Sequence, residues 1–506
     1  MIDQNLPVLT PVIFLLAALV APLVGRWKRS FSYIVALTAT AVSAVIAVYG
    51  LCYVVVNGTI HYTFGGWIPS IGIEYVLDPL AAFVIAVVTV ISLAVLIHSH
   101  RVVRVELTGR EVPYYSVAML LLTGFCGIVV TGDLFNLYVF LEISSLAAYA
   151  LIASGEKAAP VAAFRYLLMG TIGASFYLFG LWFLYTMTGS LNMADVAAIL
   201  PGVYGEVGVI IGLLLMVVGM GIKMALFPLH GWLPDAYTYT SSASTALIAP
   251  IGTKIGAYVL IRILLYVFQP GYFSDQIQLA DILMWLAAAG ILYGSIMAIA
   301  QNELKRMLAY SSIAQIGYIG LGLGMANPLG MIGAVLHVAN HAFMKACLFM
   351  VAGNLRVTIG HSDISRFDAS LRKKMPWTMA AFTVGALSMI GIPPTAGFFS
   401  KWYLVLGGID RGAWIMVVVI LVSSLMNAVY FFRVLENIYL KPALSMDEAM
   451  GDLDHPDSDP EGFQRNEATA SMLVPTLILA AGIILLGIFN AFIVNGVIRL
   501  MVPAGL

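Results

Sequence analysis

Residues 213–236 read LLLMVVGMGIKMALFPLHGWLPDA, an apolar run with one lysine at its centre and helix breakers after it. The apolar part has the composition of a membrane-spanning helix, and Lys223 lies inside it. The breakers that follow are Pro228, Gly231 and Pro234. Because proline lacks a backbone donor and clashes with the preceding turn, the helix is expected to break there. This stretch therefore predicts a discontinuous membrane helix that carries a buried charge.

The rest of the chain has the same apolar character. Its 506 residues are 61% hydrophobic and only 10% charged, with a net charge of −1, against about 25% charged residues in ordinary soluble domains. This composition excludes soluble enzymes, disordered chains and nucleic-acid-binding proteins. No Lys or Arg precedes the first apolar run, so we interpret that run as a retained first span rather than a cleaved signal.

Stretches of spanning length predict an all-α polytopic membrane protein with about 14 transmembrane helices. Their polar links are short, so the chain is expected to form one integral membrane domain. The predicted spans are 7–25, 31–56, 77–98, 114–132, 135–153, 160–187, 205–227, 244–268, 280–300, 304–325, 329–353, 376–399, 412–438 and 470–500.

The distribution of cations predicts the orientation. Lys and Arg accumulate in the cytoplasmic links of membrane proteins. If the N-terminus lies outside and the spans alternate, most of the 25 Lys and Arg residues fall in inside links, whereas the outside links hold only Arg411 and Arg499. We therefore expect a multi-pass protein of the cell membrane with both termini outside.

Two links and the cysteines lead to smaller expectations. Residues 57–76 alternate apolar and small residues, which predicts a short outward hairpin. Residues 445–467 are strongly acidic, which favours a solvated cytoplasmic loop over a docking segment for a partner subunit. Cys52, Cys126 and Cys347 have no metal-binding or disulfide spacing, so we interpret them as small buried apolar residues.

Ionisable side chains inside the spans are the candidate functional residues. A charge near the bilayer centre costs about 2.5–3.5 kcal/mol even on lenient insertion scales, so each one retained there suggests a function. The segment HVANHAFMK places His337, His341 and Lys345 at i, i+4 and i+8, on one face of a helix. Buried Lys and His can exchange protons near neutral pH, and a nearby carboxylate shifts that balance, so the set suits a proton relay. The candidates are Glu142, Lys223, Lys254, His337, His341, Lys345 and Lys401.

Simpler interpretations compete with a relay. A cation near a span end can extend its charge to the interface, which is the favoured interpretation of Arg262. The polar helix face can be a satisfied structural cluster, and the helix breaks can be packing kinks. A metal held by His337 and His341 is disfavoured because the chain has no HExxH or Glu-x-x-His arrangement, and no nucleotide-binding motif accompanies them. Repetition of buried charges over several helices favours the relay.

A second broken span corresponds to the first. The breakers of GIPPTAGFFSK, residues 391–401, stand before Lys401. With alternating spans, the helix of Lys223 runs from outside to inside and that of Lys401 runs the opposite way. In transporters, discontinuous helices in two inverted halves mark ion sites near the midplane. We therefore expect two inverted five-helix repeats, each with a broken helix. The predicted divisions are 1–113 (three N-terminal helices), 114–268 and 269–440 (the repeats), and 441–506 (acidic loop and last helix).

Six ordered segments together resemble a known family. They are DLFNLYVFLEISSLAAYAL (133–151), KMALFPLHGWLPDA (223–236), APIGTKIGAYVLIR (249–262), LKRMLAYSSIAQIGY (304–318), HVANHAFMK (337–345) and GIPPTAGFFSK (391–401). Across about residues 110–440 the chain resembles the antiporter-like membrane subunits shared by complex I (NADH:quinone oxidoreductase) and the Mrp-type multisubunit Na+/H+ antiporters. Within this family the D-type subunits of Mrp antiporters match best, because they have Lys at the position of Lys401 and no long C-terminal extension.

The resemblance implies roles at the two ends of an ion path. Glu142 and Lys223 would form the coupling pair of the inner half-channel. Lys401 would serve the outward half-channel. His230 and Asp235, both in FPLHGWLPDA, would be secondary members.

For the centre of the path, the resemblance implies a hydrated axis. Lys254 would bridge it together with the helix face of His337, His341 and Lys345. The leading expectation is therefore a proton-translocating subunit of a multisubunit Na+/H+ antiporter. The alternative is a proton-pumping membrane-arm subunit of a complex I-type enzyme or a membrane-bound hydrogenase.

Both functions imply the same surroundings. We expect other membrane subunits as partners, the lipid bilayer around the chain, protons and Na+ as transported ions, and no nucleic acid. We expect neither a redox or hydrolytic site in this chain nor a cofactor or metal. The subunits that co-purify with the chain would separate the two functions.

Overall fold

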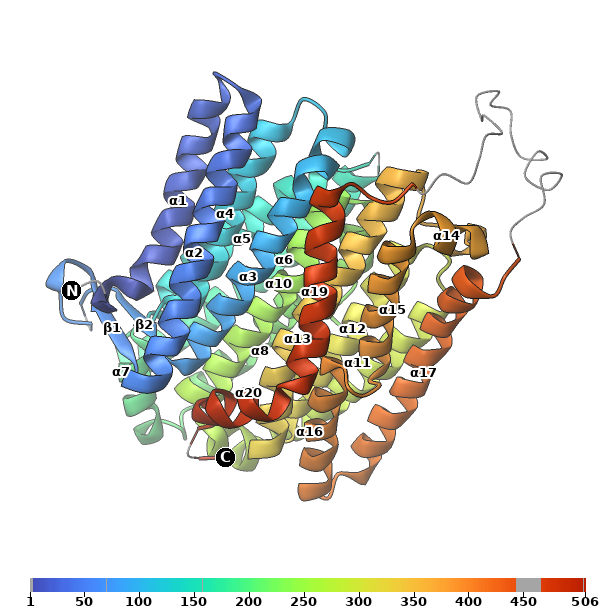
Figure 1. Cartoon of the computed structure of the whole chain (residues 1–506). Coiled ribbons are helices and arrows are strands. Elements are labelled where there is room, and N and C mark those ends of the chain that lie inside the picture. Colours follow the sequence, from blue (N-terminus) through green and yellow to red (C-terminus); the bar gives the residue numbers. More distant parts are fainter. Residues whose placement is uncertain (1–2, 70, 157, 443–465, 504) are drawn as a thin grey trace.

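The computed structural model describes residues 3–69, 71–156, 158–442, 466–503 and 505–506. Over these residues the chain is a bundle of long helices with one small pair of strands (Figure 1). The α-helices are α1 (Leu6–Gly25), α2 (Arg29–Asn57), α3 (Pro79–Glu106), α4 (Glu111–Val130), α5 (Leu134–Ala153), α6 (Ala159–Thr188), α7 (Met193–Ile199), α8 (Val207–Met224), α9 (Leu233–Tyr239), α10 (Ser242–Ile261), α11 (Leu279–Ile299), α12 (Leu304–Gly324), α13 (Pro328–Ile359), α14 (Ala369–Lys374), α15 (Pro376–Ile390), α16 (Ala396–Asp410), α17 (Trp414–Tyr439), α19 (Ala470–Ile488) and α20 (Asn490–Gly496).

Shorter helical turns and the strands complete the element order. The strands are β1 (Ile60–Thr63) and β2 (Glu74–Leu77). The short turns are η1 (Asp3–Asn5), η2 (Phe64–Gly66), η3 (Leu200–Gly202), η6 (Ile364–Arg366) and η7 (Ile498–Met501), and two π-helical turns are η4 (Arg262–Val267) and η5 (Tyr272–Gln276).

The helix lengths suit a membrane of ordinary thickness. In the described part of the chain, 12 helices are long and apolar enough to cross a membrane. Helix α12 adds another 21-residue helix to the bundle. Helices α15 and α16, of 15 residues each, follow one another across a break and together make one further pass. The predicted all-α membrane fold with about 14 passes is thus confirmed.

Two predicted spans are divided into separate helices in the structure. The span predicted at 376–399 is two helices, because the backbone leaves the helical region at Gly391 and α16 continues to Asp410. The span predicted at 470–500 ends at Ile488, and α20 begins just beyond it. Apart from its last two residues, the predicted acidic loop 445–467 lies outside the described residues, as does Lys157.

The two ends of the bundle hold different links. The α1–α2 and α3–α4 links lie at one end, which we call the cation-rich end; Arg29 and Glu111 meet there at 3.8 Å. The N-terminus, the two strands and the C-terminus lie at the opposite end, which we call the terminal end (Figure 1). An even number of passes requires this arrangement of the termini.

The predicted hairpin in residues 57–76 is present. Strands β1 and β2 pair antiparallel, with Ile60 opposite Leu77 and Thr63 opposite Glu74. Of the cysteines, Cys126 and Cys347 are buried as expected, whereas Cys52 is exposed. The expectation for Cys52 was wrong because its position on α2 faces outward from the bundle.

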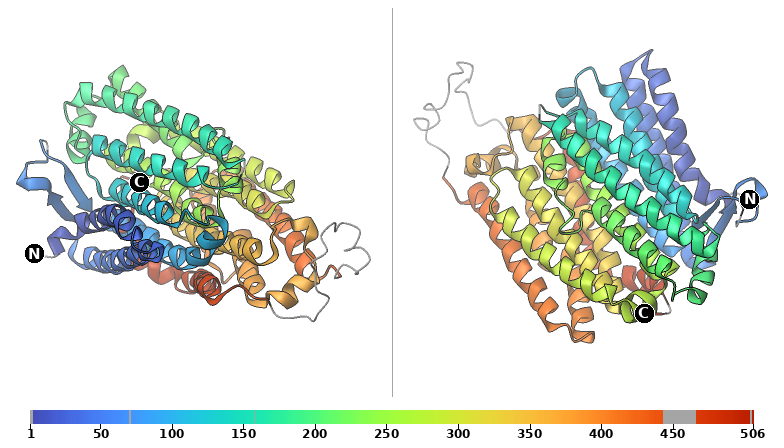
Figure 2. Two further views of the ribbon diagram at one scale, coloured as in Figure 1. Left: turned by 90° about the horizontal axis from the view of Figure 1, so that it is seen from above. Right: turned by 180° about the vertical axis from the view of Figure 1, so that it is seen from behind.

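Of the 12 candidate spans in the described chain, α10 and α13 are the most enclosed. In each, 94% of the most apolar stretch is buried. Seen from above, the N-terminal helices and α17 lie at opposite sides of the elongated bundle (Figure 2). Large apolar side chains such as Val45, Trp182 and Leu425 are exposed on the outer helices α2, α6 and α17, which suits contact with lipid. Side chains on α10 and α13 are therefore surrounded by protein.

Close packing against α6 fixes the position of α8. Gly173 and Gly180 on α6 face Gly219 and Gly212 on α8, and a Cβ added to any of them would lie within 3.0 Å of the facing backbone oxygen. Small residues at such crossings let membrane helices approach closely. This contact holds the helix that carries Lys223 against the first half of the bundle.

Candidate functional site

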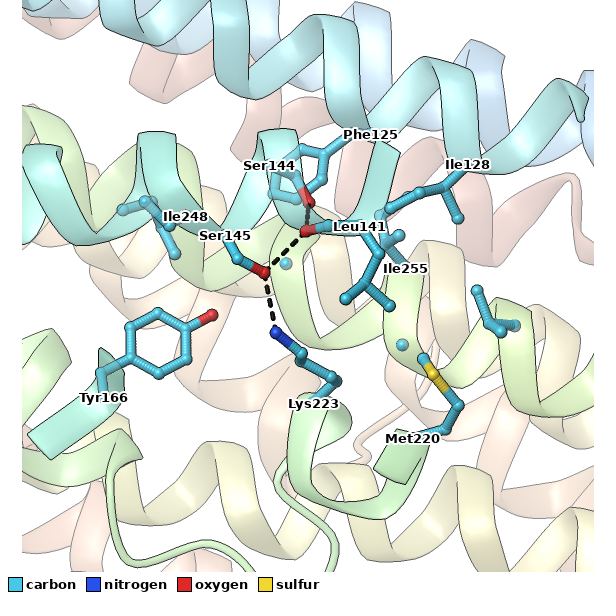
Figure 3. A pocket seen from close by; sticks show the side chains of 14 residues that line it. Phe125, Ile128, Leu141, Ser144, Ser145, Tyr166, Met220, Lys223, Ile248 and Ile255 are labelled. Carbon is cyan, nitrogen blue, oxygen red and sulfur yellow. Dashed lines mark hydrogen bonds between the residues drawn. The ribbon is translucent and has the colours of Figure 1, made fainter. Parts of the chain in front are cut away.

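The first buried lysine lies where α8 stops. Lys223 is in the last turn of α8, which ends because Ala225 takes a left-handed conformation with φ 60°. Its Nζ donates a hydrogen bond of 2.8 Å to Ser145 Oγ on α5, as Figure 3 shows. The predicted helix break after Lys223 is confirmed, and it leaves the lysine facing the interior of the bundle.

Glu142 lies one helical turn before Ser145 on α5. Its Oε1 atom is buried and has no hydrogen-bond partner within the described chain. The carboxylate does not come within 4 Å of Lys223, so Ser145 and not an ion pair connects the lysine to α5. The coupling role of Glu142 and Lys223 stays a prediction.

A small cavity adjoins Lys223. It has a volume of about 30 Å³ and is lined by side chains of α4, α5, α6, α8 and α10 (Figure 3). Ser144, Ser145 and Tyr166 supply polar groups to its wall, and Gly252 and Gly256 of α10 form another part. A cavity of this size holds about two or three water-sized groups.

Lys254 lies in the middle of α10. It is 2% exposed, and its Nζ donates a 2.8 Å hydrogen bond to the carbonyl of Ala249 on the same helix. Gly252 and Gly256, on either side of it in sequence, line the cavity beside Lys223. The two lysines therefore lie on helices that share this cavity.

The predicted polar face of α13 is fully buried. His337 and His341 stack with ring centroids 5.7 Å apart. Lys345 Nζ donates to the carbonyl of Leu308 at 2.6 Å and to Ser311 Oγ at 2.5 Å, both on α12. The spacing on α13 thus brings all three side chains into one row, as the sequence predicts.

A second group of contacts joins α13 to α16. His337 Nδ1 lies 2.9 Å from Ser400 Oγ, next to Lys401 in sequence. The Tyr318 ring lies between the two residues, 5.5 Å from the His337 ring and 5.1 Å from Lys401 Nζ. Ser400 and Tyr318 together connect the histidine face to the last lysine.

Lys401 occupies the break between α15 and α16. Helix α15 ends at Gly391, whose φ of 94° only glycine adopts readily. Lys401 Nζ donates to the carbonyls of Met389 and Ile390, both at 2.9 Å, and to Ser424 Oγ at 3.2 Å. The last carbonyls of a helix lack helical partners and carry partial negative charge, so they suit an ammonium group.

The two secondary candidates lie apart from these contacts. His230 is buried with its ring against Phe227 and Tyr293, at centroid distances of 5.4 and 4.8 Å. Asp235 binds Arg165 at 2.6 Å and Arg306 at 3.6 Å. The structure therefore shows no direct contact between either residue and the buried lysines.

The sequence analysis missed several side chains. Ser145, Ser400 and Tyr318 are small or aromatic residues whose role depends on the contact with a distant lysine, so neighbouring sequence gave no signal. Lys305 is not among the candidates from the sequence, yet it is 1% exposed and donates a 2.6 Å hydrogen bond to the carbonyl of Thr240. Its position at the start of an apolar helix could have identified it as a candidate buried lysine.

The interpretation of Arg262 as an interfacial cation was wrong. Arg262 is 8% exposed, and its guanidinium binds both carboxylate oxygens of Asp78 at 2.5 Å. Its Nε also donates to Tyr258 Oη at 2.8 Å. The arginine turns back into the bundle because Asp78, the N-cap of α3, lies within reach of the π-helical turn η4.

The fold and these contacts together define a class: a polytopic membrane protein with ionisable side chains buried along its centre. Residues 131–427 match the family described as NADH:quinone oxidoreductase/Mrp antiporter, TM. The chain belongs to this family of membrane subunits.

Individual relatives come from both branches of the family. The chain is 49% identical over 505 residues to an NADH-quinone oxidoreductase subunit N of Desulforudis audaxviator, covering 99% of each chain. It is 32% identical over 493 residues to a putative antiporter subunit mnhD2 of Staphylococcus haemolyticus, covering 97% of this chain and 94% of the relative. The higher identity to the subunit N runs against the preference for the D-type subunits that the sequence analysis expressed.

A solved structure has the same fold. A chain in the Mrp complex of Dietzia sp. DQ12-45-1b superposes with a TM-score of 0.87 at 24% identity, covering 99% of this chain and 97% of that one. At this identity the likeness shows the fold alone. Relatives in both branches are named as subunits of larger membrane assemblies, so this chain is a multi-pass membrane subunit of the antiporter-like type.

Proposed function

We propose that this chain translocates protons along the buried lysines and histidines as one subunit of a larger membrane complex. The observation that carries the proposal is the contact of His337 with Ser400 and Tyr318, which joins the histidine face of α13 to Lys401. Protons pass along such rows of hydrogen-bonding groups when each group can both receive and release one.

The proposed path has Glu142 and Lys223 as the coupling pair at the inner end. Lys254 and the row of His337, His341 and Lys345 form its centre, and Lys401 its outward end. Both His341 ring nitrogens, His337 Nε2 and Tyr318 Oη are buried without partners in the described chain. Buried polar atoms need hydrogen bonds, which water supplies where protein does not, so these atoms support a hydrated centre.

The proposed parent complex is a redox-driven assembly of the complex I type. This choice rests on 49% identity to a subunit N over nearly the whole chain. A multisubunit Na+/H+ antiporter is the second candidate, supported by 32% identity to a D-type subunit over 97% of this chain. In either complex this chain would transport ions and leave any redox chemistry to other subunits.

The proposed orientation places both termini on the outer side of the cell membrane. The α1–α2 and α3–α4 links at the cation-rich end hold cations such as Arg26 and Arg110, and such residues favour the cytoplasmic side. We also propose that residues 114–268 and 269–440 form the two inverted repeats. Their breaks support this proposal, since Lys223 precedes one break and Lys401 follows the other.

The test uses the complex purified through an affinity tag on this chain and reconstituted in vesicles. A pH-sensitive dye inside the vesicles reports proton movement driven by an imposed Na+ gradient or by NADH with a quinone. We expect NADH with quinone to move protons, and iron–sulfur subunits to co-purify. Response to the Na+ gradient alone, with small antiporter subunits present, would favour the second candidate. No proton movement under either condition, in a complex of intact composition, would refute the proposal.

A further inference from the structure

A cluster of basic side chains covers the cation-rich end of the first four helices. All its members are exposed. Among the described residues, the one ion pair within 4 Å in this cluster joins Arg29 to Glu111 at 3.8 Å. The basic cluster consists of Arg26, Lys28, Arg29, Arg101, Arg104 and Arg110.

A small pocket opens within the basic cluster, between α2, α3 and α4. Its volume is about 40 Å³, which is room for about three water-sized groups or one small polar group. The Tyr33 ring packs against the His100 ring at 4.2 Å and against the Tyr115 ring at 5.4 Å. The lining residues are Arg29, Ser30, Tyr33, His100, Arg104, Glu111 and Tyr115.

The pocket is rich in hydrogen-bond donors. Arg29 and Arg104 carry guanidinium groups, and Ser30 and Tyr33 carry hydroxyls. Glu111 is the one acid in its lining, and it faces Arg29. Two guanidinium groups with neutral donors match the oxygens of a phosphate group, which arginine binds in a bidentate manner.

The start of α2 also favours an anion at this pocket. The N-cap residue Lys28 makes no side-chain capping bond, and the first turn of α2 has no acidic residue. The first amide groups of a helix lack helical partners and carry partial positive charge, so they favour an anion. Arg29 and Ser30, in this first turn, line the pocket.

Apolar side chains are also exposed on α1, on α2 and in the link between them. Phe31 and Ile34, 40% and 49% exposed, follow Arg29 on α2, and Leu23 of α1 is 58% exposed. Trp27, between the two helices, is 83% exposed, and tryptophan favours the membrane–water interface. A molecule with a phosphate at this pocket could thus lay hydrocarbon chains along α1 and α2.

We infer that this pocket binds the phosphate group of an anionic phospholipid, with Arg29 and Arg104 as its main ligands. The acyl chains of the lipid lie against the exposed apolar side chains of α1 and α2. The bound lipid would fix the N-terminal helices against the membrane surface, independently of the proton path.

Binding of a fluorescent phosphatidylglycerol to the detergent-solubilised full chain tests the inference. Each Lys or Arg near an anionic lipid contributes about 1 kcal/mol, so Arg29→Gln/Arg104→Gln is expected to weaken binding about 30-fold. The matched control Arg372→Gln/Lys374→Gln removes two exposed charges from α14 and is expected to change binding less than about threefold. Equal weakening in the two double variants would mean that general charge, not the pocket, attracts the lipid, and would overturn the inference.

Further measurements distinguish lipid binding from binding of free phosphate, and a loss of binding from misfolding of the variant. Unlabelled phosphatidylglycerol is expected to displace the probe, whereas phosphatidylcholine and inorganic phosphate at the same concentration are not. Displacement by inorganic phosphate would assign the pocket to free phosphate and refute the lipid. Tyr33→Phe removes one donor without changing the charge and is expected to weaken binding about three- to tenfold. An unchanged affinity of this variant, at an unchanged unfolding temperature, would also count against the pocket.

Discussion

Oxygen atoms of neutral groups hold the buried lysines. Lys223 donates to a serine hydroxyl, Lys254 to a backbone carbonyl, and Lys401 to two carbonyls and a hydroxyl. Hydrogen bonds between an ammonium and a carboxylate are stronger than those to neutral acceptors. Among the described residues, these three lysines are thus held without an ion pair within 4 Å, an arrangement that would let each release its proton as the proposed relay requires.

The predicted coupling pair gives the first expectation at this scale. Glu142→Gln removes the carboxylate one helical turn before Ser145 but keeps its shape, so it should lower proton transport about 100-fold or more, as the loss of a proton-transfer group does. Lys223→Ala should do the same. Vesicle assays with a pH-sensitive dye measure the rate. Asp281→Asn, which removes an exposed acid that binds Arg411, is the control, and near-normal transport by either assembled test variant would contradict the assignment.

Ser400 is expected to matter although the sequence gave no sign of it. Ser400→Ala removes the contact with His337 Nδ1 and should slow transport about three- to tenfold, the effect of one hydrogen bond. Ser116→Ala is the matched control, because Ser116 donates 2.7 Å to the carbonyl of Ala18, between α1 and α4. Equal rates in the two variants would remove Ser400 from the path.

Lys401 and Arg262 should show opposite effects on transport. Lys401→Ala should stop transport and, because it leaves the carbonyls of Met389 and Ile390 without their ammonium donor, should cost about 1–3 kcal/mol of stability. Arg262→Ala leaves the Asp78 carboxylate, which is 15% exposed, without its partner and should cost about 3–5 kcal/mol of stability, while the molecules that remain folded transport normally. Thermal unfolding in detergent and transport per folded complex measure the two effects. A transport defect in stable Arg262→Ala protein would place this arginine in the path.

At the scale of elements, both helix breaks place a lysine beside free helix ends. Helix α8 stops at left-handed Ala225, and α15 stops at left-handed Gly391. In a continuous helix, the carbonyls of Met389 and Ile390 would accept hydrogen bonds from backbone amides of the next turn. The break therefore supplies the oxygens that Lys401 uses.

The glycine at the second break should be sensitive to a single added methyl group. In Gly391→Ala, the new Cβ meets Lys401 Cδ at 3.2 Å and lies in a strained left-handed conformation. Gly360→Ala carries the same strain, with φ 83°, but nothing lies within 4 Å of its Cβ. Both should lose about 1–2 kcal/mol of stability. Only Gly391→Ala should also lower transport, and similar transport in the two would show that the break does not position the lysine.

For the whole molecule, the sequence predicted the passes better than the contacts between them. Apolar runs bounded by polar links predicted nearly every helix, and proline and glycine predicted both breaks. The contact of Arg262 with Asp78 joins residues 184 positions apart, and the position of Tyr318 beside Lys401 also depends on packing. Such contacts leave no local pattern, so Arg262 was misread and Tyr318 was missed, whereas the row on α13 was predicted because helical spacing alone creates it.

The placement of both termini at one end leads to an expectation for the topology. Alkaline phosphatase fused to either terminus should be active in intact cells, because this enzyme folds only outside the cytoplasm. The same enzyme inserted in the α3–α4 link, 107–110, should be inactive. An active enzyme in the α3–α4 link together with inactive fusions at both termini would show that the orientation is the opposite of the proposed one.

The enclosure of α13 has a consequence for how the membrane protein is made. Of the 12 candidate spans in the described chain, α13 has the lowest mean hydropathy, and it is among the two most buried. A helix that carries two histidines and a lysine gains little from lipid and much from neighbouring helices. During synthesis, α13 would stay beside the insertion machinery until α15 and α16 have been made and can pack against it. Truncation just after α13 should therefore leave a nascent chain that quality-control proteases remove.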